Sequence, residues 1–349
     1  METEYKNFKG KKKILFILKE KSSYGSNSAP YGLLNSCKMV SESLKSHGVE
    51  SKIVSIKDSN HIDREIFNYK PTHVILEAIW CPPYKLKELL EIKRYKHIKW
   101  SIRLHSKVPF IAQERLAFQW LTDYNNISKE YNNFKISSNN EKFLEEINTS
   151  LGFKLILMPN CYTLPNYIKL NIDPIGETIN IGCFGALRTL KNQLQQAVCS
   201  IYIANKLGKK LKFHINDSST YEKEGASILN NLIYVFKNTH HELIIHKWNN
   251  HHGFIKLVKK MDIGMQISFS ETFNITAADF VSVGVPIIGS KEIEFLGREY
   301  QAKPTDFKDI IDILELTIKY KTFGFHSINE VLLRHQNKSS IKTWLEYLE

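Results

Sequence analysis

Two segments of this chain share one pattern: an apolar strand, a polar loop, an amphipathic helix ended by a glycine, and a second strand. The elements fall at residues 13–18, 33–47 and 50–56 in the first segment and at 178–184, 192–207 and 211–215 in the second. Gly48 and Gly208 follow the two helices, a position that favours glycine. This order of elements is typical of a Rossmann-like domain with a parallel sheet. The sequence therefore predicts an α/β protein with two such domains in tandem.

The stretch 261–290 predicts a further strand, turn, helix and strand within the second domain. Apolar residues alternate from 263 to 269, as they do in a strand with one buried face. Residues 270–272, Ser-Glu-Thr, offer polar caps for a helix predicted at 273–283, which Gly284 would end. The turn before this helix lies at the carboxyl end of a strand, where open α/β sheets bind ligands.

Two acidic residues in this stretch suggest a binding site. Glu271 lies in the strand-to-helix turn, and Asp279 lies about two helical turns later, roughly on the same side. Two acids beside a helix N-terminus, whose free N–H groups favour anions, suit a ligand that carries both hydroxyls and phosphates. On spacing alone, an exposed cap at Glu271 and a solvated helix charge at Asp279 explain the pattern equally well.

The same stretch resembles the donor-site signature of GT-B glycosyltransferases of the family 4 type, also called group 1. In that signature an acid is followed by an aromatic residue two positions on, a second acid eight positions on, and then G-x-P. The matching residues are Glu271, Phe273, Asp279, Gly284 and Pro286. The chain departs from the pattern twice, because Asn274 replaces the usual glycine and Asp279 replaces the usual glutamate, which is one methylene longer.

This resemblance implies both a fold and a set of roles. The implied fold is GT-B, two Rossmann-like domains facing across a cleft, with the donor nucleotide sugar bound mainly to the second domain. By analogy Glu271 lies at the transferred sugar and Asp279 binds the nucleotide ribose, while Phe273, Asn274 and Ile275 open the donor-site helix. The implied reaction moves a hexosyl or pentosyl group to an acceptor hydroxyl, with retention of anomeric configuration and without metal.

The loop 184–192 is a second candidate site. It follows a strand and opens a helix, so backbone donors and the cations Arg188 and Lys191 lie where a diphosphate could bind. It resembles the family's phosphate-binding stretch, with Lys191 six residues after Gly185. The family's arginine directly after that glycine is replaced by Ala186. Arg188 either supplies the missing charge or is a surface cation.

In the first domain, His105 ends a predicted strand. The run 103–106 (RLHS), followed by Pro109, resembles the family's cleft histidine, which faces the transferred sugar. A lone histidine is more often a satisfied or merely exposed side chain, so the residue type alone does not decide. The loop that contains Tyr24 and Gly32 would flank the acceptor and the phosphates.

The remaining elements complete the two domains. We expect strands at 71–77, 99–104, 153–158, 242–246 and 286–289, and helices at 84–93, 111–124, 141–147, 228–236, 253–260, 307–320 and 328–348. The first domain is placed at residues 1–170, the second, donor-binding domain at 171–325, and a last helix at 326–349, crossing back to the first domain. In the helix at 192–207, apolar residues including Leu194 and Val198 are expected to face inward.

Composition indicates a soluble globular protein, with 42% hydrophobic and 24% charged residues. No apolar run approaches the roughly 18 residues of a transmembrane helix, and the N-terminal apolar run is better explained by a buried strand than by a signal peptide. The five cysteines are scattered and never spaced C-x-x-C. Reduced thiols in the core of a cytoplasmic protein are therefore expected.

The net charge of +12 suggests an anionic partner or acceptor. One candidate is DNA that carries a modified pyrimidine hydroxyl, because the run 93–100 (KRYKHIKW) is both basic and aromatic. A solvated helix end explains that run more simply, and the base composition of the genome can explain the charge. A saccharide, lipid or protein acceptor is equally compatible.

Motifs for metal-dependent or covalent catalysis are absent from the sequence. There is no G-x-x-x-x-G-K-[ST], G-x-S-x-G or D-x-D, and His241 and His246 lie five residues apart in a strand-like run, unlike H-E-x-x-H. We therefore expect no metal and no cofactor besides the nucleotide-sugar substrate. Cations and a helix N-terminus would stabilise the departing diphosphate. Two alternatives stay open: a non-catalytic module that binds nucleotides or nucleic acid, and an epimerase with the GT-B fold.

Overall fold

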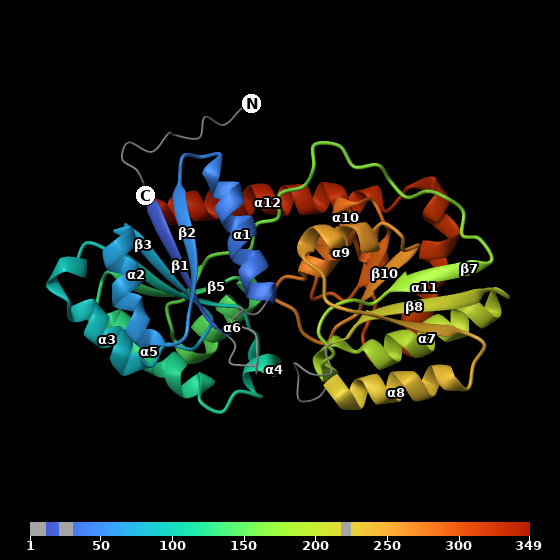
Figure 1. The fold of residues 1–349 in the computed structure, drawn as a ribbon, viewed down its shortest axis with the longest axis horizontal. Coiled ribbons are helices and arrows are strands. Elements are labelled where there is room, and N and C mark those ends of the chain that lie inside the picture. Colours follow the sequence, from blue (N-terminus) through green and yellow to red (C-terminus); the bar gives the residue numbers. More distant parts are fainter. Residues whose placement is uncertain (1–11, 21–30, 218–224) are drawn as a thin grey trace. The chain divides into compact units, whose positions relative to one another are not determined.

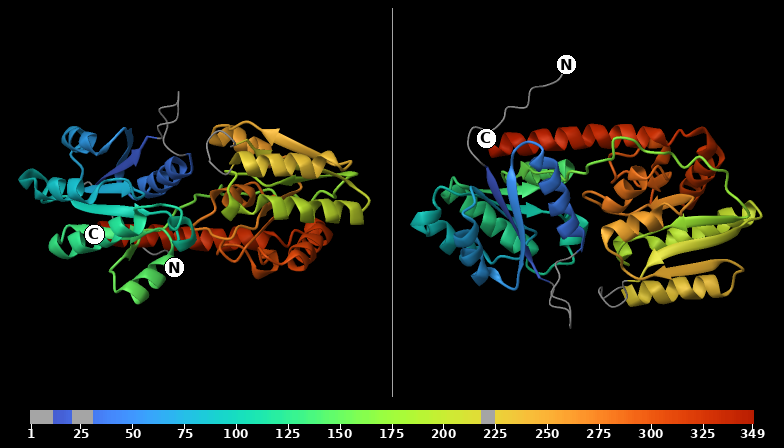
Figure 2. Two further views of the ribbon diagram at one scale, coloured as in Figure 1. Left: turned by 90° about the horizontal axis from the view of Figure 1, so that it is seen from below. Right: turned by 45° about the horizontal axis from the view of Figure 1, so that its top comes forward.

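The computed structural model describes residues 12–20, 31–217 and 225–349 (Figure 1). The chain divides into two compact units, one made of residues 1–163 with 337–349 and the other of residues 164–336. Each unit contains one parallel sheet with helices packed on it (Figures 1 and 2). Two Rossmann-like domains, the fold class predicted from the sequence, are therefore confirmed.

The first unit is built on a six-stranded sheet in which every pairing between neighbours is parallel. Its strands are β1 (Lys13–Lys19), β2 (Glu50–Ile56), β3 (His73–Glu77), β4 (Lys99–Leu104), β5 (Phe134–Ser138) and β6 (Ile156–Leu157). The strands lie in the order β2-β1-β3-β4-β5-β6, so the direction of strand addition reverses between β1 and β3. In open α/β sheets a ligand binds outside the carboxyl ends of the strands at such a switch point.

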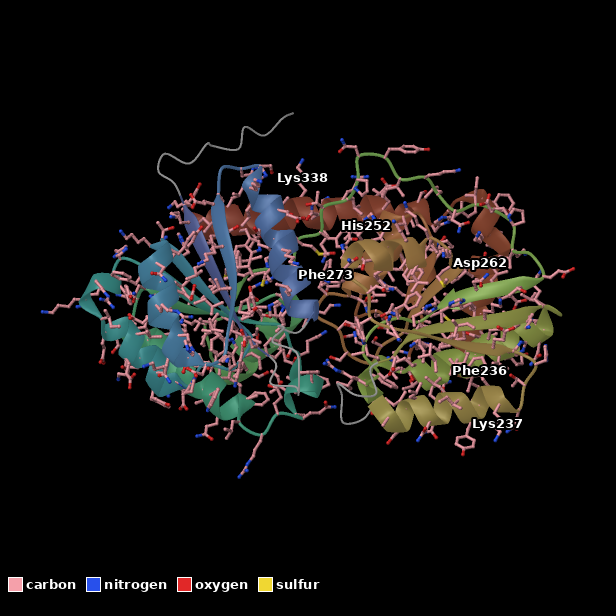
Figure 3. The ribbon with its side chains drawn as sticks, in the orientation of Figure 1. Phe236, Lys237, His252, Asp262, Phe273 and Lys338 are labelled. Carbon is pink, nitrogen blue, oxygen red and sulfur yellow. The ribbon has the colours of Figure 1, made fainter. Side chains whose placement is uncertain are left out.

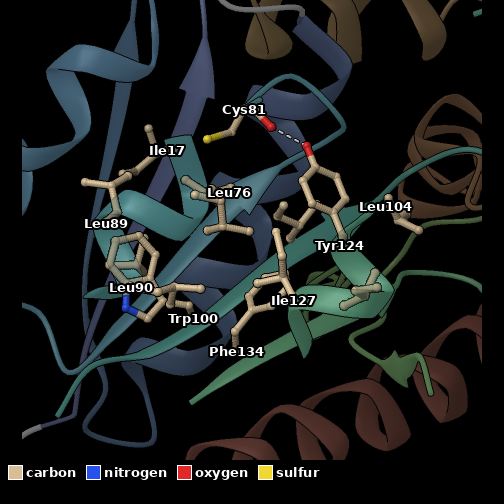
Figure 4. Packing of buried hydrophobic residues seen from close by; sticks show 14 of the residues in the cluster. Ile17, Leu76, Cys81, Leu89, Leu90, Trp100, Leu104, Tyr124, Ile127 and Phe134 are labelled. Atoms are coloured by element: carbon tan, nitrogen blue, oxygen red, sulfur yellow. Dashed lines mark hydrogen bonds between the residues drawn. The ribbon is translucent and has the colours of Figure 1, made fainter. Parts of the chain in front are cut away.

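Helices cover both faces of this first sheet. They are α1 (Tyr31–Lys45), α2 (Ile62–Tyr69), α3 (Pro83–Glu91), α4 (Val108–Ile111), α5 (Ala117–Glu130), α6 (Glu141–Leu151) and the C-terminal part of α12 (Ser327–Leu348). Alternate residues of β1 feed two separate cores. Leu15 and Ile17 pack with α3 and α5, where the Tyr124 hydroxyl donates to the Cys81 carbonyl (Figure 4). Phe16 packs on the other face with α1 and α12.

The second unit is built on a five-stranded parallel sheet in the order β11-β10-β7-β8-β9. Its strands are β7 (Thr178–Gly182), β8 (Lys210–Asn216), β9 (Glu242–His246), β10 (Ile263–Gln266) and β11 (Ile287–Gly289). Its helices are α7 (Gln193–Lys206), α8 (Gly225–Lys237), α9 (His251–Val258), α10 (Ile275–Ser282), α11 (Phe307–Tyr320) and the start of α12. Strand addition reverses between β7 and β10, which makes that pair the switch point of this sheet.

Several predicted elements need correction. The helix expected at 111–124 is two helices, α4 and α5, because Leu116 leaves the helical region with φ −109° and ψ 0°. Helix α2 and strand β5 were not expected. Strand β5 is short and partly polar, and its buried Ser137 hydroxyl lies 2.8 Å from that of Ser101. In α7, Leu194 and Val198 are exposed, and the buried face combines apolar residues with the polar side chains of Gln193, Gln196 and Ser200.

Two general expectations can be compared with the described residues. All five cysteines are buried and lie outside disulfides. Within the described ranges, the helices are too short or too polar for any of them to cross a membrane.

Candidate functional site

The switch point of the second sheet brings together the two stretches that the sequence singled out. Strand β7 leads into the loop that contains Gly185, Arg188 and Lys191, and its neighbour β10 leads into the turn that contains Glu271. Because the carboxyl ends of adjacent parallel strands lie at one edge of the sheet, both segments emerge side by side. The two loops were predicted separately, and the strand order explains why they meet.

Helix α10 approaches β7 and β10 closely because two glycines make room for Phe280. A Cβ atom on Gly182 would lie 2.8 Å from the Phe280 ring, and one on Gly264 would lie 2.7 Å from it. Real Cβ atoms essentially never come this close to another atom, so a side chain at either position would displace the Phe280 ring. The packing fixes the N-terminal end of α10 over the switch point.

An ion pair joins the two loops. Lys191, at the end of a single 3₁₀ turn (Thr189–Lys191), contacts the Glu271 carboxylate through its ammonium group. The Glu271 side chain is 7% exposed and that of Lys191 is 24% exposed, so the lysine is the more accessible partner. The Asn274 amide donates to the same carboxylate oxygen at 3.0 Å. A cation and a carboxylate thus stand together at the place where a charged ligand is expected.

A buried glutamine holds these loops together from behind. The Gln196 amide donates to the carbonyl oxygens of Lys191 at 2.8 Å and Asn192 at 3.1 Å, and its oxygen accepts from the N–H of Ile267 at 2.9 Å. A backbone bond of 2.8 Å from Phe269 to Leu190 adds a second link. Gln196 lies on the inward face of α7 and is fully buried. Sequence reasoning missed it, although a glutamine between inward apolar residues was a usable signal.

Asn274 is the N-cap of α10, which corrects the caps predicted at residues 270–272. Its side-chain oxygen accepts from the N–H of Ala277 at 2.7 Å, and its amide also donates to Gln266 at 2.9 Å. The helix begins at Ile275, so Phe273 lies before it and not within it. Phe273, labelled in Figure 3, is half-buried with its ring 5.4 Å from that of Phe295.

The glycine-containing loop after β7 has the backbone shape expected of a ligand-binding turn. Gly185 has φ +115°, a conformation that favours glycine, and its N–H donates to the Asn216 side chain at 3.0 Å. Arg188 is half-buried and extended just before the 3₁₀ turn. Asn192 closes the turn with φ 58° and precedes the first residue of α7.

Asp279 lies in the second turn of α10 and is buried. Its carboxylate contacts the Nε2 atom of His251 at 2.7 Å, and His251 is the first residue of α9. From the sequence, the histidine pair at 251–252 was expected to lie in a loop. The structure brings Asp279 to His251, and Glu271 to Lys191.

The first unit has a different polar cluster at the carboxyl ends of β3 and β4. His105 contacts the carboxylate of Glu77 through Nε2, and its Nδ1 atom lies 3.3 Å from the Asn139 amide. Ala78, directly after Glu77, has φ 71°, which non-glycine residues rarely adopt. Its N–H donates to the Arg103 carbonyl at 2.9 Å, which fixes the end of β3 against β4.

Arg103 is the centre of this cluster and is fully buried. Its guanidinium lies 3.3 Å from Glu77 and donates to the Met158 carbonyl at 2.7 Å and the Pro159 carbonyl at 3.0 Å. The same group stands over the Trp344 ring of α12, 5.3 Å from its centroid. The sequence identified Arg103 only as part of the run around His105, and gave no role to Glu77.

The electrostatics of the cluster favour an ionised Glu77 and a neutral His105. Burial alone would raise the pKa of Glu77, but the charge of Arg103 and the hydrogen bond from His105 hold it below its usual value. Burial lowers the pKa of His105, and the Arg103 charge adds to that effect, while Glu77 opposes it. Because the guanidinium already compensates the carboxylate, we take the imidazole to be neutral.

The acceptor-side residues expected in the first unit are only partly described. Tyr24 lies outside the described residues. Gly32 is not in a loop: it lies in the first turn of α1 and is exposed. The described part of the chain contains no group of three or more His, Cys, Asp or Glu side chains placed to bind a metal ion.

Comparison with known proteins shows the fold. No protein-family model and no curated protein matches the sequence. Among solved structures, a sucrose-phosphate synthase from Thermosynechococcus elongatus matches with a TM-score of 0.70 and 13% identity, over 97% of this chain and 98% of that one. HepE from Anabaena in complex with UDP-glucose matches with a TM-score of 0.63 and 12% identity, over 95% and 99%.

A third match is the E. coli trehalose-6-phosphate structure bound with UDP-2-fluoro glucose, with a TM-score of 0.63 and 9% identity over 96% of this chain and 98% of that one. At such low identity the likeness shows the fold. The matches cover nearly the whole of this chain and of each neighbour. The predicted GT-B fold is therefore confirmed.

Proposed function

We propose, on the premise that this chain has the GT-B fold, that it is a glycosyltransferase that moves a sugar from a nucleotide-sugar donor to an acceptor hydroxyl. The observation that carries the proposal is the Lys191–Glu271 pair at the switch point of the second sheet. Two of the neighbours bear on the donor, because their names describe a UDP-glucose complex and a UDP-2-fluoro glucose complex. A uridine diphosphate sugar is accordingly our first candidate.

The ion pair gives the second unit a way to respond to the donor. A diphosphate entering the Gly185 loop competes for the Lys191 ammonium, which is the more exposed partner. Once Lys191 turns to the phosphates, Glu271 loses its cation but keeps the Asn274 donor and can accept hydrogen bonds from sugar hydroxyls. Donor binding thus exchanges one internal contact for two contacts to the ligand.

Transfer requires stabilisation of the negative charge that develops on the departing diphosphate. Lys191, Arg188 and the N–H groups of the loop are positively polarised groups held in place before the reaction. We propose that these groups take the place of a bridging metal ion, and that the anomeric configuration is retained. His105 stays a proposed sugar-facing residue of the first unit, with its ring oriented by Glu77 and Asn139.

For the acceptor we propose an anionic molecule, with hydroxylated-pyrimidine DNA as the case to test first. The support is the net charge of +12. Duplex binding that weakens steeply with salt is expected for a DNA acceptor, and no binding at low salt excludes it.

A cytoplasmic location fits five buried thiols outside disulfides.

The test of the main proposal is a donor screen followed by a transfer assay. UDP, ADP and GDP and their glucose conjugates are screened by thermal shift, because a ligand that binds only the folded state raises the melting temperature. The best donor is then used to measure sugar release and transfer. For Glu271→Ala we expect turnover lower by two to three orders of magnitude with an unchanged fold. Glu315→Ala, at a surface acid of α11, is the matched control and should behave as wild type.

Three results separate the possibilities. Wild-type transfer by Glu271→Ala removes Glu271 from the mechanism. Donor binding without any hydrolysis or transfer favours a non-catalytic binding module. Sugar interconversion without an acceptor favours an epimerase.

A further inference from the structure

The segment that leads into β4 carries a dense group of cations. Residues 93–99 contain four lysine or arginine side chains and one histidine, but no acid. All five are exposed, and they are Lys93, Arg94, Lys96, His97 and Lys99. The polar clusters at the carboxyl ends of the strands do not include this segment.

Strand pairing brings a further lysine to the same edge of the first sheet. The Lys99 N–H donates to the Thr72 carbonyl at 3.0 Å, and the Thr72 N–H donates to the Lys13 carbonyl at 2.9 Å. The amino ends of β4, β3 and β1 therefore lie side by side, about 4.8 Å from one strand to the next. Lys70, two residues before Thr72, is exposed at this edge. The cations thus follow a line across the strand ends.

Much of this positive charge is not neutralised by the protein. Within the described residues, four exposed lysines of this edge take part in no ion pair: Lys70, Lys93, Lys96 and Lys99, called the edge lysines below. Asp63, an acid that contacts this segment, is already paired with Arg94 at 2.8 Å. Burial is the largest cause of the low pKa of His73 at the start of β3, and the charge of Lys99 is the next. The edge lysines therefore create a positive potential that an anionic partner can compensate.

The edge lysines lie at the opposite end of the first sheet from His105. Lys99 begins β4, and His105 follows the last residue of that strand. Six residues of extended chain separate the two by about 20 Å, at about 3.3 Å per residue. A partner bound by the edge lysines is therefore held on a surface separate from the carboxyl ends of the strands, where ligands of such sheets bind.

We propose that the edge lysines dock the phosphate backbone of a nucleic acid. A lysine that neutralises a backbone phosphate releases a bound counterion, which favours binding of a linear polyanion along a row of cations. Phe67 of α2 is 59% exposed, and the Arg94 guanidinium stands over its ring, 5.7 Å from the centroid. An exposed aromatic ring beside cations is a platform on which an unpaired base can stack. This docking surface goes beyond the proposed transfer, because nucleic-acid binding requires no donor.

An anionic membrane would attract the same lysines, but the aromatic chemistry of this edge favours nucleic acid. Surfaces that bind lipid insert apolar side chains at the boundary between headgroups and acyl chains. Inserting the Phe67 ring would carry the Arg94 guanidinium toward the lipid with it. Beside a nucleic acid, the same guanidinium can stack on a base or bind a phosphate.

Two triple variants with equal charge test the position of the surface. The edge variant is Lys70→Gln/Lys96→Gln/Lys99→Gln, and the control variant is Lys237→Gln/Lys308→Gln/Lys319→Gln. The control variant removes three exposed lysines of the second unit, of which Lys237 is labelled in Figure 3. Each variant loses three positive charges from the net charge of +12, so the two differ only in where the charge is lost.

The experiment measures binding of a mixed-sequence DNA oligonucleotide, single-stranded and as a duplex, by fluorescence anisotropy on the full chain without donor. We expect the wild type to bind both forms at low salt. At about 100 mM salt the edge variant should bind about tenfold more weakly, and its slope of log affinity against log salt should be shallower by about 2–3. The control variant should stay within about twofold of wild type. Melting curves check that both variants are folded.

The outcomes separate this inference from a general effect of charge and from the proposed function. Equal weakening in the two variants would mean that net charge alone attracts DNA, and the docking surface is then wrong. It is also wrong if the wild type binds no DNA at low salt. If the edge variant keeps DNA binding but loses binding to vesicles of phosphatidylserine and phosphatidylcholine, the edge binds membranes instead. Donor binding and donor hydrolysis should be the same in the edge variant as in wild type, so failure of the donor screen would leave DNA docking intact.

Discussion

Each unit places a carboxylate and a cation at the carboxyl ends of parallel strands, yet the two pairs differ in access to water. Glu77 and Arg103 in the first unit are fully buried. Glu271 and Lys191 in the second unit are 7% and 24% exposed, and the lysine is the exposed side. The same two chemical groups can therefore act as a fixed internal support or as a contact that a ligand can displace. Burial of the cation decides between these two uses.

The buried Glu77–Arg103 pair, called the sealed pair below, has contacts on several sides. A buried charge needs such partners because water does not reach it. The partners of Arg103 include Glu77 of β3, the carbonyl oxygens of Met158 and Pro159, and the ring of Trp344. Removal of one buried partner leaves the other charge uncompensated in a medium that solvates it poorly. Lys191 lies close to water, so solvent can take over much of its partner's role.

The largest expected effect follows from breaking the sealed pair. Arg103→Met should lower the free energy of unfolding of the first unit by about 3–5 kcal/mol, because Glu77 is left buried without its cation. Urea unfolding followed by tryptophan fluorescence measures this loss. Arg94→Met, at an exposed arginine paired with Asp63, is the matched control and should change stability little. A loss at Arg103 no greater than the control would show that the two clusters do not differ as described.

The Glu271–Lys191 pair is the open pair, because its lysine reaches solvent. Breaking this pair should affect function more than stability. Lys191→Met should lower transfer by about 100-fold, because the departing diphosphate loses a preorganised cation. Its free energy of unfolding should fall by less than that of Arg103→Met, because Glu271 keeps the Asn274 donor and some access to water. Steady-state kinetics and urea unfolding on the same sample give both values. Lys206→Met, which removes a surface pair with Glu315, controls for loss of a lysine. If Lys191→Met instead causes a large loss of stability with normal kinetics, the Glu271–Lys191 pair is a structural support and not a ligand contact.

Substitutions of Asn274 test how Glu271 and the start of α10 are positioned. Asn274→Ala removes both the cap of α10 and a donor to Glu271, and should cost about 1 kcal/mol of stability. Asn274→Gly introduces the residue usual in the family, and should cost only a few tenths of a kcal/mol through the cap. Both should weaken transfer, since Glu271 loses the amide. If thermal melts show the alanine and glycine variants to be equally stable, the cap does not contribute to stability as described. Wild-type transfer by both variants would remove the Asn274 amide from the site.

Both units should lose stability at low pH, because each contains a buried histidine. This is a property in which the two units are expected to be alike. Burial lowers the pKa of His73 in β3 and of His214 in β8 to about 4 each. Between about pH 6.5 and 4 the unfolded chain therefore binds more protons than the folded one, and stability falls as pH falls. His73→Gln or His214→Gln should reduce the loss between pH 7 and 5 by about 1–2 kcal/mol. Urea unfolding at the two pH values checks this, and an unchanged slope would mean that these rings are protonated in the folded state.

The sequence allowed most strands to be predicted, and it singled out two loops of the second unit as a candidate site, because these signals are local. Strand β9 and helix α11 have the predicted bounds, since each is a continuous apolar or amphipathic run between clear breaks. Gly185, Lys191 and Glu271 were identified by their spacing within single strand–loop–helix units. Their meeting follows from the sheet order, in which β10 pairs with β7.

What the sequence did not indicate depends on contacts between distant segments. Gln196 bridges two loops that lie far apart along the chain, and Glu77 has its meaning only beside Arg103. His251 and Asp279 come from different helices, so no spacing rule connects them. The short strand β5 was missed because its buried serines form hydrogen bonds and carry no apolar signal.

The helix α12 has a consequence for how the protein is made. Its residues Trp344, Leu345 and Leu348 fill the core formed by β1 and α1, and the Trp344 indole donates to the Pro159 carbonyl at 2.7 Å. These residues follow the whole second unit along the chain. During translation, the core of the first unit therefore stays incomplete beside Phe16 until the second unit and the end of α12 have been synthesised.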